Sequence, residues 1–293
     1  MALISKHNII RLVAASLSTL TLVAGAGCGS SSSSSTDSSK SGSTDSSTIS
    51  QQTVTPGTLT IATGEPAYAP YVLDNKPETG KGFEAAVAYA VGEKMGFKKD
   101  QIKWTRSTFD EAIAPGAKDY DMNIQQFSIT PERKKAVDFT PSYYNSPQSI
   151  VVRADSKFAS ATSLKEIKAG TVGAMVGSTS YTFAKQKVKD DIKTFNDNVA
   201  LAQALDSNQI DAIVVDTPVA VDITESKQVK DGKVVGQIAD SDDPEGIGIV
   251  LPKGSKLTKA ASQAVTDLTK DGTIKKLQET WLKEYTTDIP ILK

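Results

Sequence analysis

The 293-residue chain contains one cysteine, one histidine and few aromatic residues (6%). The histidine is His7 and the cysteine is Cys28, so both lie near the N-terminus. A single cysteine cannot form an intrachain disulfide, and the rest of the chain has no histidine base, no thiol nucleophile and no His/Cys metal cluster. The formal net charge is −1, without a strongly basic or acidic block, which gives no indication of nucleic-acid binding.

The chain also lacks an apolar run long enough to form a membrane-spanning helix at its start. Residues 1–11 carry Lys6 and Arg11, and residues 12–24 form an uncharged, mostly apolar run. This pattern is typical of a secretory signal, and the run is too short to cross a bilayer. We therefore expect export from the cytoplasm.

Cys28 directly follows this segment in the sequence Gly-Ala-Gly-Cys-Gly-Ser. The arrangement resembles a bacterial lipobox, although Gly25 stands where such sites usually have Leu or Val. The expectation is a lipoprotein signal over 1–27 and an acylated Cys28 that anchors the protein to the outer face of the cell membrane. An ordinary signal peptide with an incidental cysteine is the alternative. Residues 28–53 are dominated by serine and are predicted to form a flexible linker.

Residues 54–293 are predicted to form the folded part, an α/β protein. Short β-rich runs alternate with segments that have helical periodicity. Strands are predicted at 58–62, 101–105, 121–124, 149–152, 171–174 and 211–215. Apolar residues share one helical face at Phe83, Val87, Ala90 and Val91, and another at Leu257, Ala261, Ala264, Val265 and Leu268. Alternation of this kind favours open, mostly parallel sheets with helices on both faces.

In such sheets ligands bind at the carboxyl ends of the strands. Polar residues follow three of the predicted strands at this edge: Ser128, the run 177–180, and Asp216. The run 173–179 has neither the spacing nor the lysine of a phosphate loop, which excludes that mode of nucleotide binding.

A short helix is predicted to start at Thr130. Thr130 suits the N-cap, Pro131 suits the first helical position, and Glu132 suits the positive end of the helix dipole. Arg133 then falls in the first turn, where a cation is mildly disfavoured. It is either a surface arginine at the edge of a basic run or a residue placed there for a binding site.

The whole segment 121–144 resembles the signature of bacterial extracellular solute-binding proteins of family 3, which serve ABC importers of polar amino acids. The resemblance extends over about residues 59–285. It implies a two-lobed, type II periplasmic-binding-protein-like fold with the ligand cleft between the lobes. We assign 54–145 and 247–293 to lobe 1 and 146–246 to lobe 2, with crossing strands near 144–148 and 241–247.

The resemblance also implies roles for polar residues. Arg133 would bind the ligand's α-carboxylate, for which a guanidinium is a rigid two-pronged donor. Ser128 would contribute a hydroxyl, and Ser178 and Thr179 would direct backbone N–H groups at the same carboxylate. Asp216 would pair with the α-ammonium group, while its alternative role is to cap the helix that begins at Thr217.

Two aromatic residues would enclose the ligand's aliphatic stem. Tyr68 and Phe109 match the two aromatic positions of the family, although from sequence alone core packing is the commoner role for such residues. Tyr71 and Phe127 are predicted to belong to the core.

Selection of the ligand's side chain is the least determined feature. Glu65 falls, after one inserted residue, where binders of basic amino acids carry an acid. Gln126 stands where the family usually has glycine, and its amide is expected to influence selection. Gly-Phe-Glu-Ala-Ala at 82–86 departs from the family's Gly-Phe-Asp-x-Asp, and we expect Glu84 to be structural.

The function implied is binding of a polar amino acid outside the membrane and delivery to an ABC permease and its ATPase by closure of the lobes. Whether that amino acid is basic stays open. No metal or cofactor is expected, and the protein is expected to be monomeric and not an enzyme. The alternatives are an enzyme similar to cyclohexadienyl dehydratase and a tethered amino-acid sensor.

Overall fold

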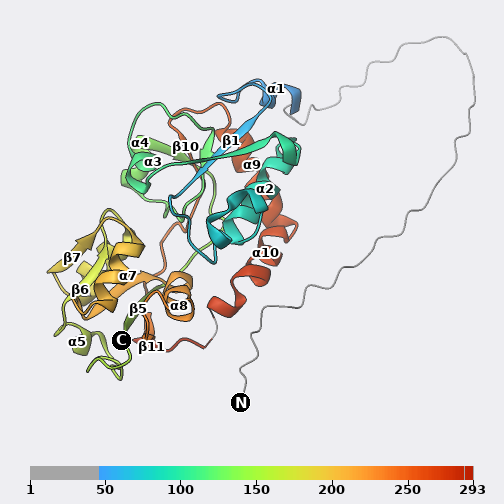
Figure 1. Ribbon diagram of the computed structural model, residues 1–293. Coiled ribbons are helices and arrows are strands. Elements are labelled where there is room, and N and C mark those ends of the chain that lie inside the picture. The colour runs from blue at the N-terminus through green and yellow to red at the C-terminus, as the bar shows by residue number, and fades with distance from the viewer. Residues whose placement is uncertain (1–45, 287, 293) are drawn as a thin grey trace, which may run out of the picture. The chain divides into compact units, whose positions relative to one another are not determined.

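The computed structural model describes residues 46–286 and 288–292. The predicted signal over 1–27, the lipidation site Cys28 and most of the linker 28–53 lie outside these residues. The described chain forms two α/β lobes, each built around its own sheet (Figure 1). Within the described residues, no helix is both long and apolar enough to cross a membrane.

Lobe 1 contains a five-stranded sheet in the order β2-β1-β3-β10-β4. Its strands are β1 (Leu59–Thr63), β2 (Ile102–Arg106), β3 (Met122–Asn123), β4 (Val137–Phe139) and β10 (Val250–Pro252). The helices in the same part of the chain are α1 (Ser46–Ser50), α2 (Phe83–Lys94), α3 (Phe109–Ile113), α4 (Pro131–Ala136), α9 (Thr258–Lys270) and α10 (Thr273–Trp281). Short turns of 3₁₀ helix are η1 (Leu73–Asn75), η2 (Pro77–Thr79), η3 (Lys99–Gln101) and η5 (Lys283–Tyr285).

Lobe 2 contains a six-stranded sheet in the order β11-β9-β5-β8-β6-β7. Its strands are β5 (Gln148–Arg153), β6 (Val172–Met175), β7 (Ile192–Phe195), β8 (Ala212–Asp216), β9 (Gly232–Ile238) and β11 (Ile291–Leu292). Its helices are α5 (Leu164–Ile167), α6 (Thr179–Phe183), the π-helical turn η4 (Ala184–Val188), α7 (Asn198–Asp206) and α8 (Thr217–Glu225).

Both sheets are mixed: lobe 1 has two parallel and two antiparallel pairs, and lobe 2 has three parallel and two antiparallel pairs. β1 pairs in parallel with β2 and β3, and β6 pairs in parallel with β7 and β8. The antiparallel pairs involve β10 and β5, which are the strands that the chain enters after passing from one lobe to the other. Because neighbouring parallel strands run in the same direction, the loops that follow them gather at one edge of each sheet.

The predicted helical faces are confirmed and form much of the lobe 1 core. In α2, Phe83, Val87 and Val91 are fully buried, and Ala90 packs against them from the margin. In α9 all four predicted helical positions are buried, and Leu257 caps the helix from inside the core. Tyr71 and Phe127 are also fully buried, as predicted for core residues.

The chain passes between the sheets three times, and the first two connections, between β4 and β5 and between β9 and β10, are neighbours. They run side by side: the Ile247 N–H donates to the Tyr144 carbonyl at 2.8 Å, and the Gln148 N–H donates to Ser241 Oγ at 2.8 Å. Asn145 adds a side-chain hydrogen bond to the carbonyl of Asp243. A pair of neighbouring connections is the usual arrangement for a hinge between two lobes.

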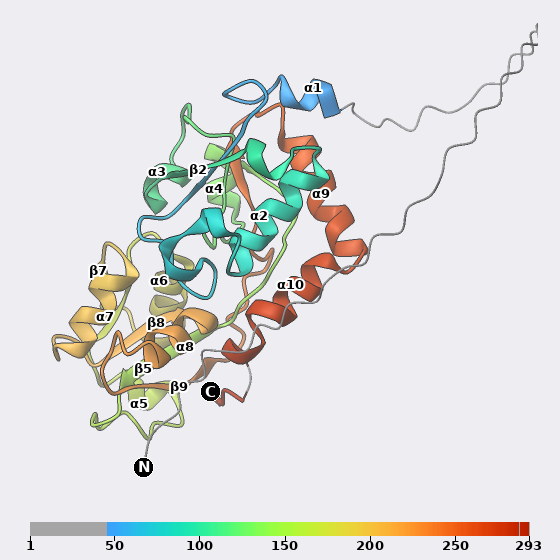
Figure 2. The ribbon, with the colours of Figure 1, turned by 45° about the vertical axis from the view of Figure 1, so that its right-hand side comes forward.

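The structure differs from the sequence-based boundaries at both ends of the folded part. At the C-terminus, α10 leads toward the other lobe and β11 joins β9 of lobe 2, so the assignment of all of 247–293 to lobe 1 is wrong for its last residues (Figure 2). At the N-terminus, residues 46–53 are not a free coil, because α1 forms there and Ile49 enters the lobe 1 core. In each case one apolar side chain, Leu292 or Ile49, is buried in the hydrophobic core of the folded part.

Candidate functional site

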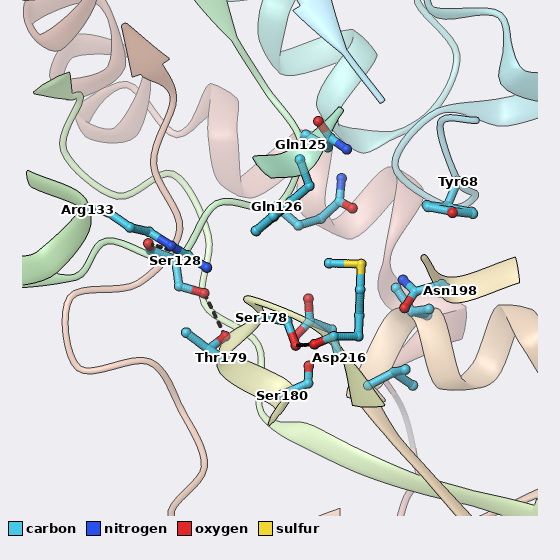
Figure 3. Close-up of a pocket in the computed structure, with 14 residues that line it drawn as sticks. Tyr68, Gln125, Gln126, Ser128, Arg133, Ser178, Thr179, Ser180, Asn198 and Asp216 are labelled. Carbon is cyan, nitrogen blue, oxygen red and sulfur yellow. Dashed lines mark hydrogen bonds between the residues drawn. The ribbon is translucent and has the colours of Figure 1, made fainter. Parts of the chain in front are cut away.

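A pocket lies where the two lobes meet, and fourteen residues line it (Figure 3). Eight of the nine binding residues expected from the sequence are among them: Tyr68, Phe109, Gln126, Ser128, Arg133, Ser178, Thr179 and Asp216. Residues from lobe 1 (Gln125 and Gln126) lie on one side, and residues from lobe 2 (Ser178 and Asp216) lie on the other. The pocket therefore depends on both lobes.

Arg133 is held in the pocket by its own helix. Thr130 caps α4, with its side-chain oxygen accepting from the Arg133 N–H at 3.2 Å, and Pro131 occupies the first turn. This geometry is the one that the sequence predicts. Unlike its neighbours Lys134 and Lys135, Arg133 is buried, with 8% of its surface exposed. The alternative of a surface arginine is therefore excluded.

The guanidinium of Arg133 touches both lobes. Nη1 donates to the Ser128 carbonyl at 2.8 Å, Nη2 donates to the Gly177 carbonyl at 3.0 Å, and the group lies over the Phe109 ring, 5.1 Å from its centroid. None of the ion pairs among the described residues includes Arg133. Burial lowers its pKa, while the charges of Asp243, Asp216 and Asp110 act in the opposite direction without forming an ion pair with it. A buried cation without a paired anion is costly, so the site favours an anionic ligand group.

Hydroxyl groups surround this cationic end. Ser128 Oγ and Thr179 Oγ1 are 2.9 Å apart and join the lobes by a hydrogen bond. Ser178 caps α6: its Oγ accepts from the Tyr181 N–H at 3.0 Å and donates to the Met175 carbonyl. The N–H groups of Thr179 and Ser180 open that helix, and such first-turn groups have no partner within the helix itself. They are suitable donors for a carboxylate beside Arg133.

Asp216 provides the anionic group of the pocket. It ends β8 and precedes α8, but its side chain makes no capping hydrogen bond to that helix. Instead, Oδ1 accepts from Gln148 Nε2 at 2.6 Å. Desolvation and the nearby Asp243 raise the pKa of Asp216 to about 7, against the opposing effects of Gln148 and Arg133. An ammonium group at this carboxylate would stabilise its ionised form.

The two expected aromatic residues lie on the lobe 1 side. Phe109 begins α3 and packs against Phe127 with ring centroids 4.9 Å apart. Tyr68 lies near the start of α7 in lobe 2, and burial together with the charge of Asp197 raises its pKa to about 12. Tyr68 is thus a neutral phenol that closes one side of the pocket.

Glu65 is the expected residue that the structure places elsewhere. It lines an adjoining cleft, which shares Tyr68, Phe109 and other residues with the pocket. Its carboxylate pairs with Arg106, with Oε2 3.3 Å from Nε, and accepts from Asn75 Nδ2 at 3.0 Å. The Glu65 carboxylate is therefore already paired within the protein, whereas the sequence-based hypothesis has it pair with a basic side chain of the ligand.

Several lining residues were not assigned from the sequence. They are Gln125, Met175, Ser180, Asn198, Val215 and Val219. Ser180 and Asn198 each follow a helix cap at the end of a strand, so the strand-end rule could have found them. The apolar residues carry no such signal, because their sequence pattern is that of the core.

No group of three or more His, Cys, Asp or Glu side chains within the described part of the chain is arranged to hold a metal ion. The pocket instead combines a buried cation, helix N–H groups, one carboxylate and aromatic walls between two lobes. Hydrogen bonds from Arg133 and Ser128 already cross the cleft. This is the construction of a two-lobed solute-binding protein that closes around a small polar molecule.

Comparison with known families agrees with this class. Residues 59–284 match the model for bacterial extracellular solute-binding proteins, family 3, and the chain belongs to that family. The fold and the family predicted from the sequence are therefore confirmed.

Three relatives illustrate its range. The L-cystine-binding protein TcyJ of Escherichia coli (strain K12) is 30% identical over 228 residues, covering 77% of this chain and 82% of TcyJ. A solved ancestral arginine-binding protein bound to arginine is 33% identical, with a TM-score of 0.64, covering 77% of this chain and 98% of that one. The ancestral amino acid-binding protein AncCDT-1, a precursor of cyclohexadienyl dehydratase, is 29% identical, with a TM-score of 0.63, covering 77% and 95%.

Proposed function

We propose that the protein binds a polar L-amino acid outside the membrane and delivers it to the permease of an ABC importer. The observation that carries this proposal is Arg133, a buried cation in the cleft that has no ion pair among the described residues. A guanidinium in this state requires an anion, and a carboxylate matches its two-pronged geometry. The relatives described above bind amino acids, which supports the choice of carboxylate ligand.

The second half of the proposal concerns the α-ammonium group. Asp216 lines the same pocket and is oriented by Gln148 rather than by the helix that it precedes. A zwitterion offers one charge to each of Arg133 and Asp216, so binding neutralises both at once. The hydroxyls of Ser128 and Thr179 and the helix N–H groups would complete the carboxylate end, and Tyr68 and Phe109 would enclose the stem.

Closure of the lobes is the proposed source of affinity and the signal to the permease. Arg133 holds carbonyls of both lobes, and Ser128 holds Thr179 across the cleft. The paired connections at Tyr144–Ile247 and Gln148–Ser241 would act as the hinge. Opening would expose the ligand to solvent, which is the step that release to a permease requires.

Anchoring is proposed from the sequence alone. The signal-like segment 1–27 and Cys28 favour a lipid-anchored protein on the outer face of the cell membrane, with a serine-rich tether between anchor and body. Such a tether would keep the binding protein close to its permease. We further propose that the protein acts as a monomer.

The enzyme alternative has less support. AncCDT-1 is described as a precursor of a dehydratase, yet it is itself an amino acid-binding protein. After the proposed signal cleavage this chain has no histidine, and the pocket's carboxylate is the one that we assign to the ammonium group. We therefore propose a binding protein without catalytic activity. The sensor alternative is distinguished by gene context, because a neighbouring permease and ATPase would favour transport.

A thermal-shift screen tests the proposed function. The protein is unfolded, freed of bound molecules and refolded, and then screened against the twenty amino acids, ornithine, citrulline and cystine. A ligand that binds only the folded state raises the melting temperature by mass action. Stabilisation by a related group of polar amino acids is expected. No stabilisation by any of them after refolding would refute the amino-acid proposal.

A further inference from the structure

Gln126 is held in an unusual conformation at the edge of the pocket. Its φ of 50° lies in the left-handed region, which residues other than glycine rarely adopt. Its backbone N–H donates to Glu84 Oε1 at 2.8 Å, and its side-chain Nε2 donates to Glu84 Oε2. One carboxylate from α2 therefore fixes both the backbone and the side chain of this residue.

Glu84 is fully buried and is surrounded by donors. Besides the two groups of Gln126, the hydroxyl of Tyr143 donates to Oε1. An ionised carboxylate only accepts hydrogen bonds, so it must face the NH₂ group of an amide and not its oxygen. This requirement determines which way the amide of Gln126 is turned.

The other end of that amide faces the pocket. Gln126 lines the pocket, and its Oε1 takes part in no hydrogen bond within residues 46–286 and 288–292. We propose that Glu84 locks Gln126 with Oε1 toward the ligand, so that the site selects side chains that carry N–H donors over those that carry a carboxylate. This inference rests on the proposed amino-acid binding and narrows the ligand to amino acids with amide, guanidinium or ammonium side chains.

The residues around Gln126 also favour ligand side chains that donate hydrogen bonds over side chains that carry a carboxylate. The neighbouring Gln125 lines the pocket as well, and its Oε1 is buried without a partner in the described structure. Apart from Arg133, no basic residue of the described chain lines either the pocket or the adjoining cleft, whose lining includes Asp110 and Asp197. A ligand carboxylate beyond the α-carboxylate would therefore find no second basic side chain in either cavity and would lie near the carboxylates of Asp110 and Asp197.

The test compares glutamine with glutamate, which have nearly the same shape but differ in whether the side chain donates. Affinities are measured by calorimetry on the refolded full chain at pH 8, above the pKa of about 7 to which burial raises Glu84. The wild-type protein is expected to bind glutamine at least about ten-fold more tightly than glutamate, since a buried acceptor facing a carboxylate is left unpaired.

The decisive variant is Glu84→Gln. The new amide keeps an oxygen for the Gln126 N–H and the Tyr143 hydroxyl, but its NH₂ now needs an acceptor. Gln126 should then turn its Oε1 toward residue 84 and present Nε2 to the ligand. We expect the preference for glutamine over glutamate to fall at least about ten-fold. Asp222→Asn, which neutralises a buried acid that lines neither cavity, is the matched control and should leave the preference unchanged.

A second variant separates the amide's orientation from a loss of charge. Gln126→Gly removes the amide, keeps the backbone N–H and suits the positive φ. In this background Glu84→Gln should leave the preference unchanged, because no amide remains to turn. An equal change in both backgrounds, or none in either, would overturn the inference. If Glu84→Gln does not fold, Gln126→Gly alone must still lower the preference for glutamine.

The outcome also separates this inference from the proposed function. If the refolded wild-type protein binds neither these two nor any other amino acid, the proposed function fails. If it binds them and the variants do not shift the preference, only the role of Gln126 and Glu84 fails.

Discussion

The two ends of the pocket are built in different ways. At the end where we propose that the ligand carboxylate binds, Thr130, Pro131 and Arg133 lie within one short segment, and the cap of α4 fixes the backbone from which the Arg133 side chain extends. At the opposite end, Asp216 and Gln126 are oriented by residues far away in the chain. Gln148 holds Asp216, and Glu84 holds Gln126.

This difference suggests a division of roles. Arg133 and Asp216 carry the charges that would pair with the two groups that every amino acid shares. Gln126 is turned by a distant partner, and its orientation changes when that partner changes, which suits the choice between side chains. We therefore expect substitutions of Arg133 or Asp216 to reduce binding of all amino acids and substitutions of Gln126 or Glu84 to change which ones bind.

The largest effect is expected from Arg133→Ala. Removing one partner of a buried charge pair typically costs about 2–5 kcal/mol, or about 30-fold to several thousand-fold in affinity. All amino acids that bind should lose affinity to a similar extent in calorimetric titrations. Lys134→Ala is the matched control, because Lys134 lies in the same helix and pairs with Glu245 at the surface. Near-native affinity in Arg133→Ala would show that the carboxylate binds elsewhere.

Asp216→Asn should have the next largest effect and should depend on the ligand. A hydrogen bond to a charged group contributes about 1.5–3 kcal/mol, so amino acids should bind about 10- to 100-fold more weakly. Analogues without the α-amino group should change by less than about three-fold. The measurement is the ratio of the two losses, and equal losses would reduce Asp216 to a structural residue at the start of α8.

The pH dependence of binding should follow Asp216. Its pKa is raised to about 7, and an ammonium group needs the ionised carboxylate, so affinity should fall as the pH falls below about 7. Since the apparent affinity scales with the ionised fraction, the loss between pH 8 and pH 5 should approach about 100-fold. Asp216→Asn should abolish this dependence, and an unchanged profile in that variant would assign it to another group.

The stability of the unliganded protein should respond to pH with the opposite sign. A carboxyl whose pKa is higher in the folded state binds more protons there than in the unfolded chain. The contribution of Asp216 to the free energy of unfolding therefore decreases as the pH rises from about 4 to about 7. Melting temperatures measured with and without ligand over this range would separate the two effects.

The smallest effect is expected from Glu65→Gln. Glu65 is more than half exposed and pairs with Arg106, and exposed ion pairs contribute about 0–1 kcal/mol. Affinity for lysine or arginine should change by less than about three-fold. A much larger loss, confined to basic amino acids, would restore the hypothesis that Glu65 selects the side chain.

The same contrast explains what could be predicted from the sequence. The cap at Thr130, the buried faces of α2 and α9, and the strand before Asp216 follow from neighbouring residues, and the structure confirms them. The bond between Glu84 and Gln126 joins residues 42 positions apart, so no local pattern indicates it. The family resemblance predicted the two lobes and the candidate site residues. It could not predict the orientation of Gln126, because this residue departs from the family pattern.

The N- and C-terminal differences have a similar cause. Serine-rich composition predicts coil up to residue 53, yet α1 forms at Ser46–Ser50 and its Ile49 packs into the hydrophobic core. The pairing of β11 with β9 depends on two residues, Ile291 and Leu292, and a strand this short has no detectable periodicity. Contacts made by one or two side chains depend on the tertiary structure rather than on local sequence.

The most direct test of the claim that Arg133 binds the ligand's α-carboxylate is a thermodynamic cycle, in which the two groups are removed separately and together. Calorimetry would compare the best amino acid from the screen with its decarboxylated amine, in the wild-type protein and in Arg133→Ala. We predict that removing the ligand carboxylate costs the wild-type protein at least about 30-fold and costs the variant little. The same loss in both proteins would contradict the assignment of Arg133 to the carboxylate.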